Sequence, residues 1–176
     1  LTEKVMNMSG KPVKVLLAKK KIDVHGRASK LIARELRDAG MEVVYFRFGT
    51  VDEIVNAALQ EDVDVIAVSI MTSGHLHVAE NLVPALKAKG MNDVMVIFGG
   101  IIPDVDFEPL EKMGVHRSFP AGLPGSVVVD YINASWRDFL NPSVYRDAGI
   151  KDAYAAREMA IHSTACREHR NRASVR

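Results

Sequence analysis

Short apolar runs alternate along the chain with segments whose apolar positions recur at helical spacing. The run at residues 63–69 is almost entirely apolar, which is typical of a strand covered on both faces of a sheet. This alternation predicts a parallel sheet whose strands are connected by helices. The predicted strands cover residues 13–18, 42–46, 63–69, 94–100 and 115–119, and the predicted helices cover residues 27–39, 77–89, 109–112 and 123–140, with a further helix beginning after Thr50.

Capping signals support several of these boundaries. Thr50 can cap the second helix, and Glu53, three residues on, would complete a capping box. Gly40 is a typical stop signal after the first helix. In that helix, periodicity predicts an apolar face made of Leu31, Ile32, Leu36 and Ala39. Five strands and five helices in this sequence predict a flavodoxin-like doubly wound fold with strand order 2-1-3-4-5.

The composition changes near residue 141. Asn141-Pro142 interrupts the last predicted helix of the fold, and residues 151–169 are rich in alanine and arginine. That second segment is too polar to form a core of its own. We therefore predict a domain over residues 11–140 and a helical C-terminal extension over residues 141–176 that could dock on a partner subunit.

Charge and composition exclude several functional classes. The net charge is +1, so no broad positive field points to nucleic acid. No apolar stretch approaches the roughly 20 residues of a membrane span, and no signal peptide is visible. Cys166 is the single cysteine, which excludes an intramolecular disulfide and suits a reducing compartment. We expect a cytoplasmic protein.

Residues that could bind a ligand or a metal follow three of the predicted strands. Asp23 and His25 follow the first strand, Ser69 ends the third, and a glycine pair ends the fourth. In a doubly wound sheet, ligands bind beyond the carboxyl ends of the strands at the point where the strand order reverses. An imidazole there can ligate a metal, and a carboxylate two residues earlier can fix its tautomer. The hydroxyl and the glycines predict a slot along the sheet.

These residues occur in a combined pattern that resembles a known family. The chain reads Asp23-x-His25-x-x-Ala28, then Ser69-x-Met71, then Gly99-Gly100. It resembles the cobalamin-binding domain of coenzyme B12-dependent mutases and of methionine synthase, whose pattern is Asp-x-His-x-x-Gly, Ser-x-Leu and Gly-Gly. The resemblance covers about residues 11–135. Further matches to the acyl-CoA mutases are Lys19, Arg27, Gly74 and His75.

The resemblance implies a role for each matching residue. His25 would be the lower axial ligand of cobalt, supported by Asp23 and Lys19. Ser69 would bind a benzimidazole nitrogen of the cofactor's nucleotide tail, and Met71 would pack on its ring. The remaining implied cofactor contacts are Gly26, Arg27, Ala28, Gly74, His75, Gly99, Gly100, Phe119, Pro120 and Gly122, with Ala121 in the same last loop.

Two residues depart from the family pattern. Ala28 replaces a glycine, which would cost about 1 kcal/mol if the position required a positive φ. Met71 replaces a leucine of similar volume. Without the motif match, His25 would be an exposed loop histidine, Asp23 and Lys19 a surface pair, Ser69 a strand-end cap and Gly99-Gly100 a tight turn.

The same resemblance implies an activity. The chain would be the small subunit of an adenosylcobalamin-dependent acyl-CoA mutase, an isomerase that rearranges carbon skeletons by radical chemistry after homolysis of the cobalt–carbon bond. A separate large barrel subunit would bind the acyl-CoA. The alternatives are a corrinoid methyl-carrier protein, a stand-alone cobalamin carrier or sensor, and a flavodoxin-like domain that binds no corrin.

Overall fold

The computed structural model describes residues 6–7 and 10–139. By internal contacts the chain divides into two units, residues 1–133 and 134–176, and of the second only the last turns of one helix are described. The predicted extension over residues 141–176 lies outside the described residues.

The fold is a five-stranded parallel sheet in the order β2-β1-β3-β4-β5, which confirms the predicted flavodoxin-like topology. Every predicted strand and helix is present, with ends shifted by a few residues. The strands are β1 (Lys14–Lys20), β2 (Glu42–Phe48), β3 (Val65–Ile70), β4 (Met95–Gly100) and β5 (Arg117–Pro120). The helices are α1 (Arg27–Asp38), α2 (Val51–Glu61), α3 (His75–Ala88), α4 (Phe107–Met113) and α5 (Gly125–Phe139), with a 3₁₀ turn, η1, at Asp104–Asp106.

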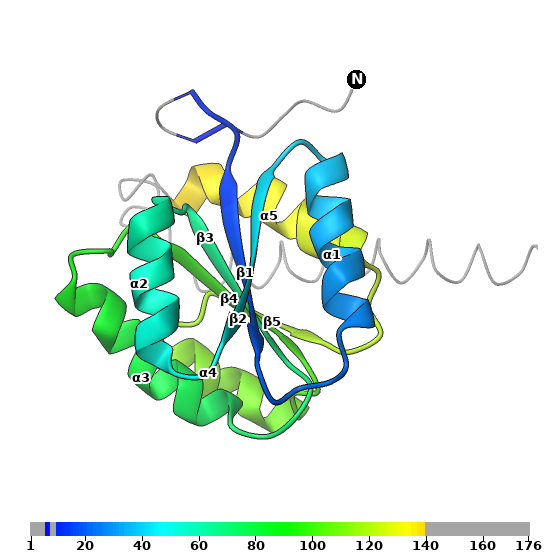
Figure 1. Cartoon of the computed structure of the whole chain (residues 1–176), viewed down its shortest axis with the longest axis vertical. Helices are drawn as coiled ribbons and strands as arrows, with labels where there is room; N and C mark the ends of the chain where they lie inside the picture. The colour runs from blue at the N-terminus through cyan, green and yellow to red at the C-terminus, as the bar shows by residue number, and fades with distance from the viewer. Residues whose placement is uncertain (1–5, 8–9, 140–176) are drawn as a thin grey trace, which may run out of the picture. The chain divides into compact units, whose positions relative to one another are not determined.

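The two faces of the sheet are packed differently. Helices α2, α3 and α4 cover one face, and α1 with the part of α5 up to Asn133 covers the other (Figure 1). The largest cluster of buried apolar side chains lies on the first face, where strand residues such as Leu16, Ile66 and Phe98 meet Ile54 and Leu82 from the helices. Burial of this cluster is the main source of stability.

Two helices differ in detail from the prediction: α2 in its N-terminal cap and α1 in its buried face. Thr50 Oγ1 accepts a hydrogen bond from Glu53 N at 3.4 Å, as expected, but the Glu53 carboxylate accepts from Gly49 N at 2.7 Å instead of from the cap itself. The predicted apolar face of α1 was wrong at Leu31, which is half exposed. The helix buries Ser29, Ala33 and Leu36. Leu31 is two residues from both Ser29 and Ala33, and a step of two residues in an α-helix places it on the opposite side.

Gly100 is the position where the fold requires a glycine. Its φ is +130°, and a Cβ built there would lie 1.9 Å from the carbonyl oxygen of Ile70 on the neighbouring strand. Any side chain would force β3 and β4 apart at their carboxyl ends. Gly99, one residue earlier, has no such restriction, because its nearest neighbours would be 3.8 and 3.9 Å from a Cβ.

We predict that Gly100→Ala lowers the free energy of unfolding by about 2–5 kcal/mol, since it combines backbone strain with a clash against backbone. Urea unfolding of the purified chain measures this. Gly49→Ala is the control, because Gly49 is exposed, has an ordinary φ and would meet only side-chain atoms at 3.6 Å or more. Equal stability of the two variants would contradict the assignment.

Candidate functional site

The sheet register places the residues of the three motifs in one row. Lys19 on β1 is paired with Ser69 on β3, Ser69 with Gly99 on β4, and Gly99 with Phe119 on β5. The row lies at the carboxyl ends of the strands, where the strand order reverses between β1 and β3. The sequence motifs, although far apart in the chain, therefore meet along one edge of the sheet, as the spacing predicts.

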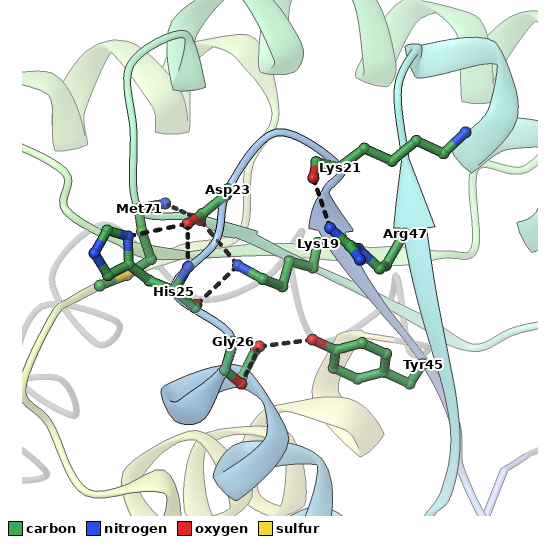
Figure 2. A network of polar contacts seen from close by, with 9 residues as sticks. Lys19, Lys21, Asp23, His25, Gly26, Tyr45, Arg47 and Met71 are labelled. Carbon is green, nitrogen blue, oxygen red and sulfur yellow. Dashed lines mark hydrogen bonds and ion pairs between the residues drawn. The ribbon is translucent and has the colours of Figure 1, made fainter.

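Asp23 is the centre of the polar contacts at this edge (Figure 2). Its side chain is fully buried, and its Oδ2 lies 3.0 Å from Nζ of Lys19, which is also buried. Oδ2 accepts a second hydrogen bond from Met71 N at 3.0 Å, and Oδ1 accepts one from His25 N at 2.9 Å. The carboxylate therefore joins β1, its own loop and the loop after β3.

These contacts change the acidity of Asp23. Burial would raise the pKa of its carboxyl group, but the N–H of His25, the Lys19 ammonium and the N–H of Met71 together outweigh burial, so the pKa lies below its ordinary value. Asp23 is therefore an anion at neutral pH, and its charge is compensated by Lys19.

The imidazole of His25 extends from this support toward solvent. His25 Nδ1 lies 3.3 Å from Oδ1 of Asp23, while 70% of the side chain is exposed. Lys19 Nζ also donates to the carbonyl oxygen of His25 at 2.8 Å, which fixes the backbone beneath the ring. If Nδ1 carries the proton that faces the carboxylate, the lone pair of Nε2 is available to a metal. This geometry fits metal ligation by His25 with Asp23 as its carboxylate partner.

The two neighbouring lysines, Lys20 and Lys21, also form contacts that hold the loop after β1 in place. Lys20 Nζ donates to the carbonyl oxygen of Ser73 at 3.1 Å, and Lys21 Nζ is paired with Glu53 at 3.0 Å. Arg47 on β2 donates to the carbonyl oxygen of Lys21 at 2.6 Å. The run of three lysines thus ties the loop after β1 to the surrounding elements.

A cavity of about 110 Å³ opens beside this loop, on the face of the sheet covered by α1 and α5. Its floor is made of small or apolar strand residues, among them Leu17, Ala67 and Ser69, and its far wall is the loop after β5. Of the predicted cofactor contacts, the cavity lining contains Ala28, Ser69, Met71, Gly99, Gly100, Phe119, Pro120 and Gly122, together with Ala121.

The residues around the cavity fit a planar aromatic group. The lining is predominantly apolar, and the missing side chain at Gly99 leaves space that a Cβ could occupy without touching the protein more closely than 3.8 Å. Ser69 supplies a hydroxyl within this wall. An exposed imidazole, a buried carboxylate partner and an adjoining apolar slot match the needs of a cobalamin bound through a histidine with its nucleotide tail inserted.

Comparison with known proteins decides the family. A profile of the B12 binding domain matches residues 13–122, which is more than half of the chain. The chain belongs to the B12-binding domain family. It is 41% identical over 128 residues to the 2-hydroxyisobutanoyl-CoA mutase small subunit of Aquincola tertiaricarbonis, a match that covers 72% of this chain and 94% of the relative.

A second relative agrees with this membership, and a solved structure agrees with the fold. The pivalyl-CoA mutase small subunit of Xanthobacter autotrophicus is 38% identical over 125 residues, covering 70% of this chain and 84% of the relative. Among solved structures, a cobalamin-binding protein from Desulfitobacterium hafniense superposes with a TM-score of 0.58 and 24% identity, covering 72% of this chain and 59% of that one. At that identity, the superposition supports the fold alone.

The departure from the family pattern at Ala28 has a simple explanation. Ala28 lies in the first turn of α1, in helical backbone, and it contributes to the cavity lining. The position does not require a positive φ, so the strain considered from the sequence does not arise. Met71 contributes to both parts of the site, because its N–H binds Asp23 and the residue belongs to the cavity lining.

Besides Asp23 and His25, four predicted contact residues lie outside the cavity lining. Gly26 is the N-cap of α1, and Arg27 is exposed beside it. Gly74 is the N-cap of α3 with a φ of +101°. His75 is buried, and its Nε2 lies 2.8 Å from Asp106 Oδ2 in η1. Their contact with a cofactor stays a prediction.

Sequence reasoning missed Ser29 and Tyr45. Ser29 is buried in the first turn of α1, lines the cavity and forms a 2.9 Å hydrogen bond with the hydroxyl of Tyr45 on β2. Its position next to Ala28 in the motif was a usable signal, since a serine there is one helical step from the slot. Nothing in the sequence pairs it with Tyr45.

No helix among the described residues is long and apolar enough to cross a membrane.

We predict that Asp23→Asn lowers the free energy of unfolding at pH 7 by about 3 kcal/mol or more, because it leaves the buried Lys19 ammonium without a counter-charge. Folding lowers the pKa of Asp23, so its stabilising contribution is present above about pH 4 and is lost as the pH falls through the folded-state value. The difference between wild type and variant should therefore shrink below about pH 4.

Urea unfolding from pH 7 to pH 2.5 measures this difference. Glu108→Gln serves as the control, because it disrupts an exposed ion pair with Lys112 and should change stability little. A difference between wild type and Asp23→Asn that stays constant down to pH 2.5 would show that the Asp23 charge does not stabilise the loop.

Proposed function

We propose that this chain is the cobalamin-binding small subunit of an adenosylcobalamin-dependent acyl-CoA mutase, an isomerase completed by a separate large subunit that binds the acyl-CoA. The observation that carries the proposal is the exposed His25 imidazole, backed by the buried Asp23–Lys19 pair and placed beside an apolar cavity. The names of the two small-subunit relatives support the reaction class and the division into subunits.

The polar contacts support the proposed roles around the metal. His25 would bind cobalt through Nε2, while its Nδ1–H would donate a hydrogen bond to Asp23. The Asp23 anion makes the imidazole a stronger donor, and Lys19 keeps that anion charged and in place. Breaking any one of these links would change both the position and the basicity of the ring.

The cavity supports the proposed roles around the nucleotide tail. Ser69 would hydrogen-bond to a ring nitrogen, Met71 would pack against the ring, and the bare backbone of Gly99 would allow the ring to lie flat on β4. Phe119 is held in the far wall by an edge-to-face contact with Tyr131, whose ring centroid is 5.5 Å away. These residues would bind and orient the tail without chemistry of their own.

The bound cofactor would supply the radical for a 1,2 carbon-skeleton rearrangement. This chain would hold the corrin against the large subunit, which would bind the acyl-CoA and determine its identity. The single cysteine and the partner class are consistent with a cytoplasmic enzyme.

We predict that the chain binds adenosylcobalamin and hydroxocobalamin with a base-off/His-on absorption spectrum. His25→Ala should remove that spectrum and weaken binding by about 100-fold or more, because the variant loses the metal ligand. Absorption titration measures both effects, and His77→Ala, an exposed histidine on α3, is the control. An unchanged cobalt spectrum in His25→Ala would contradict the proposal.

Reconstitution separates the mutase from the alternative functions. Turnover of an acyl-CoA by the chain together with a large barrel subunit from the same organism supports the mutase. Cobalamin binding with methyl transfer to a methyltransferase partner would instead support a methyl carrier. Binding with neither activity would support a carrier or sensor.

We predict that Gly99→Ala folds normally but binds cobalamin about 10- to 100-fold more weakly, because a methyl group occupies space in the slot. The matched probe is cobinamide, a corrinoid without the nucleotide tail, whose binding should change little. Gly49→Ala is the protein control. Equal loss of affinity for cobalamin and cobinamide would show that Gly99 does not contact the tail.

A further inference from the structure

The backbone around His25 is fixed although its side chain is exposed. Gly26 N donates to the carbonyl oxygen of Val24 at 3.0 Å, and Lys19 Nζ donates to the carbonyl oxygen of His25 at 2.8 Å. Ser29 Oγ donates to the carbonyl oxygen of Gly26 at 3.1 Å. Three consecutive carbonyl groups of the loop are therefore held by hydrogen bonds.

The third of these contacts is itself supported from another strand. The Ser29 hydroxyl has a single proton, which it gives to Gly26. The 2.9 Å contact between Ser29 Oγ and Tyr45 Oη must therefore have the tyrosine as donor. A chain of two hydrogen bonds runs from Tyr45 on β2, through buried Ser29, to the carbonyl group of Gly26 next to His25. Figure 2 shows Tyr45 and Gly26 at its two ends.

Ser29 also belongs to the cavity lining. A serine in the first turn of a helix often bonds to a carbonyl three or four residues earlier, so the bond to Gly26 alone would be unremarkable in a helix. Here the same hydroxyl is fully buried, is oriented by a tyrosine 16 residues away and forms part of the slot wall. The slot and the His25 loop thus share one side chain.

We propose that Tyr45 and Ser29 are positioning residues that hold the His25 loop ready for cobalt ligation. The inference rests on the proposed function and adds two residues to it. Lys19 anchors the loop from β1. Met71 anchors it from the loop after β3, because its N–H binds Asp23. Tyr45 provides the corresponding anchor from β2, through Ser29. With this anchor present, ligation does not have to order the loop, and binding is correspondingly tighter.

Tyr45→Phe tests this inference. It removes one hydroxyl at a position that is about one-third exposed, so the variant should fold. We expect adenosylcobalamin to bind about three- to tenfold more weakly, with a smaller His-on fraction at saturation. Asn81→Ala is the control: it removes an exposed side-chain hydrogen bond to the carbonyl oxygen of His77 on α3, on the face of the sheet opposite the cavity.

The His25→Ala background distinguishes positioning from a purely structural role. If Tyr45 acts through the histidine, Tyr45→Phe should not weaken corrinoid binding further once His25 is alanine. Tyr45→Phe and Ser29→Ala should also be non-additive in the presence of His25, since both break one chain of hydrogen bonds. An equal loss of affinity from Tyr45→Phe in both backgrounds would overturn the inference.

The same titrations separate this inference from the proposed function. Wild-type protein with a His-on spectrum, and Tyr45→Phe indistinguishable from it in affinity and spectrum, would overturn the positioning role alone. Wild-type protein that binds adenosylcobalamin without histidine ligation would overturn both.

Discussion

The buried ion pair of Asp23 and Lys19 is the interaction on which the site depends. Both side chains are removed from water, an arrangement that is unfavourable unless the charges are paired and the remaining polar atoms are hydrogen-bonded. Here each carboxylate oxygen receives a backbone N–H, one from His25 and one from Met71, and the ammonium also donates to a carbonyl. Because few geometries satisfy all these groups at once, the pair specifies how the loops after β1 and β3 meet.

The sheet separates stability from ligand binding. On the face covered by α2, α3 and α4, side chains such as Leu16 and Phe98 fill the space between sheet and helices. On the other face, the row that ends the strands contains Ser69 and Gly99, which fill little volume, and a cavity remains beneath α1. A void in a core normally costs stability. The well-packed opposite face can compensate for this cost.

The sequence predicted the secondary-structure elements better than it predicted individual side-chain contacts. Apolar runs identified every strand, and the family pattern singled out His25, Asp23 and half of the cavity lining, because these depend on local composition and on strand ends that meet at one edge. The direction of Leu31 was wrong, since periodicity alone did not reveal that α1 buries a serine. The contact between Ser29 and Tyr45 joins a helix to a strand 16 residues away, and no local pattern encodes it.

The arrangement also explains how one loop can present a reactive side chain and remain well ordered. Exposure of the His25 imidazole leaves Nε2 accessible, whereas the backbone on either side is held through Lys19, Asp23 and Ser29. Freedom is thereby confined largely to the side-chain torsions, and Asp23 restricts even those. A ligand fixed in this way loses little conformational entropy when it binds a metal, so more of the coordination free energy contributes to affinity. The hydrogen bonds beneath the histidine therefore matter to the site as much as the residue that would contact cobalt.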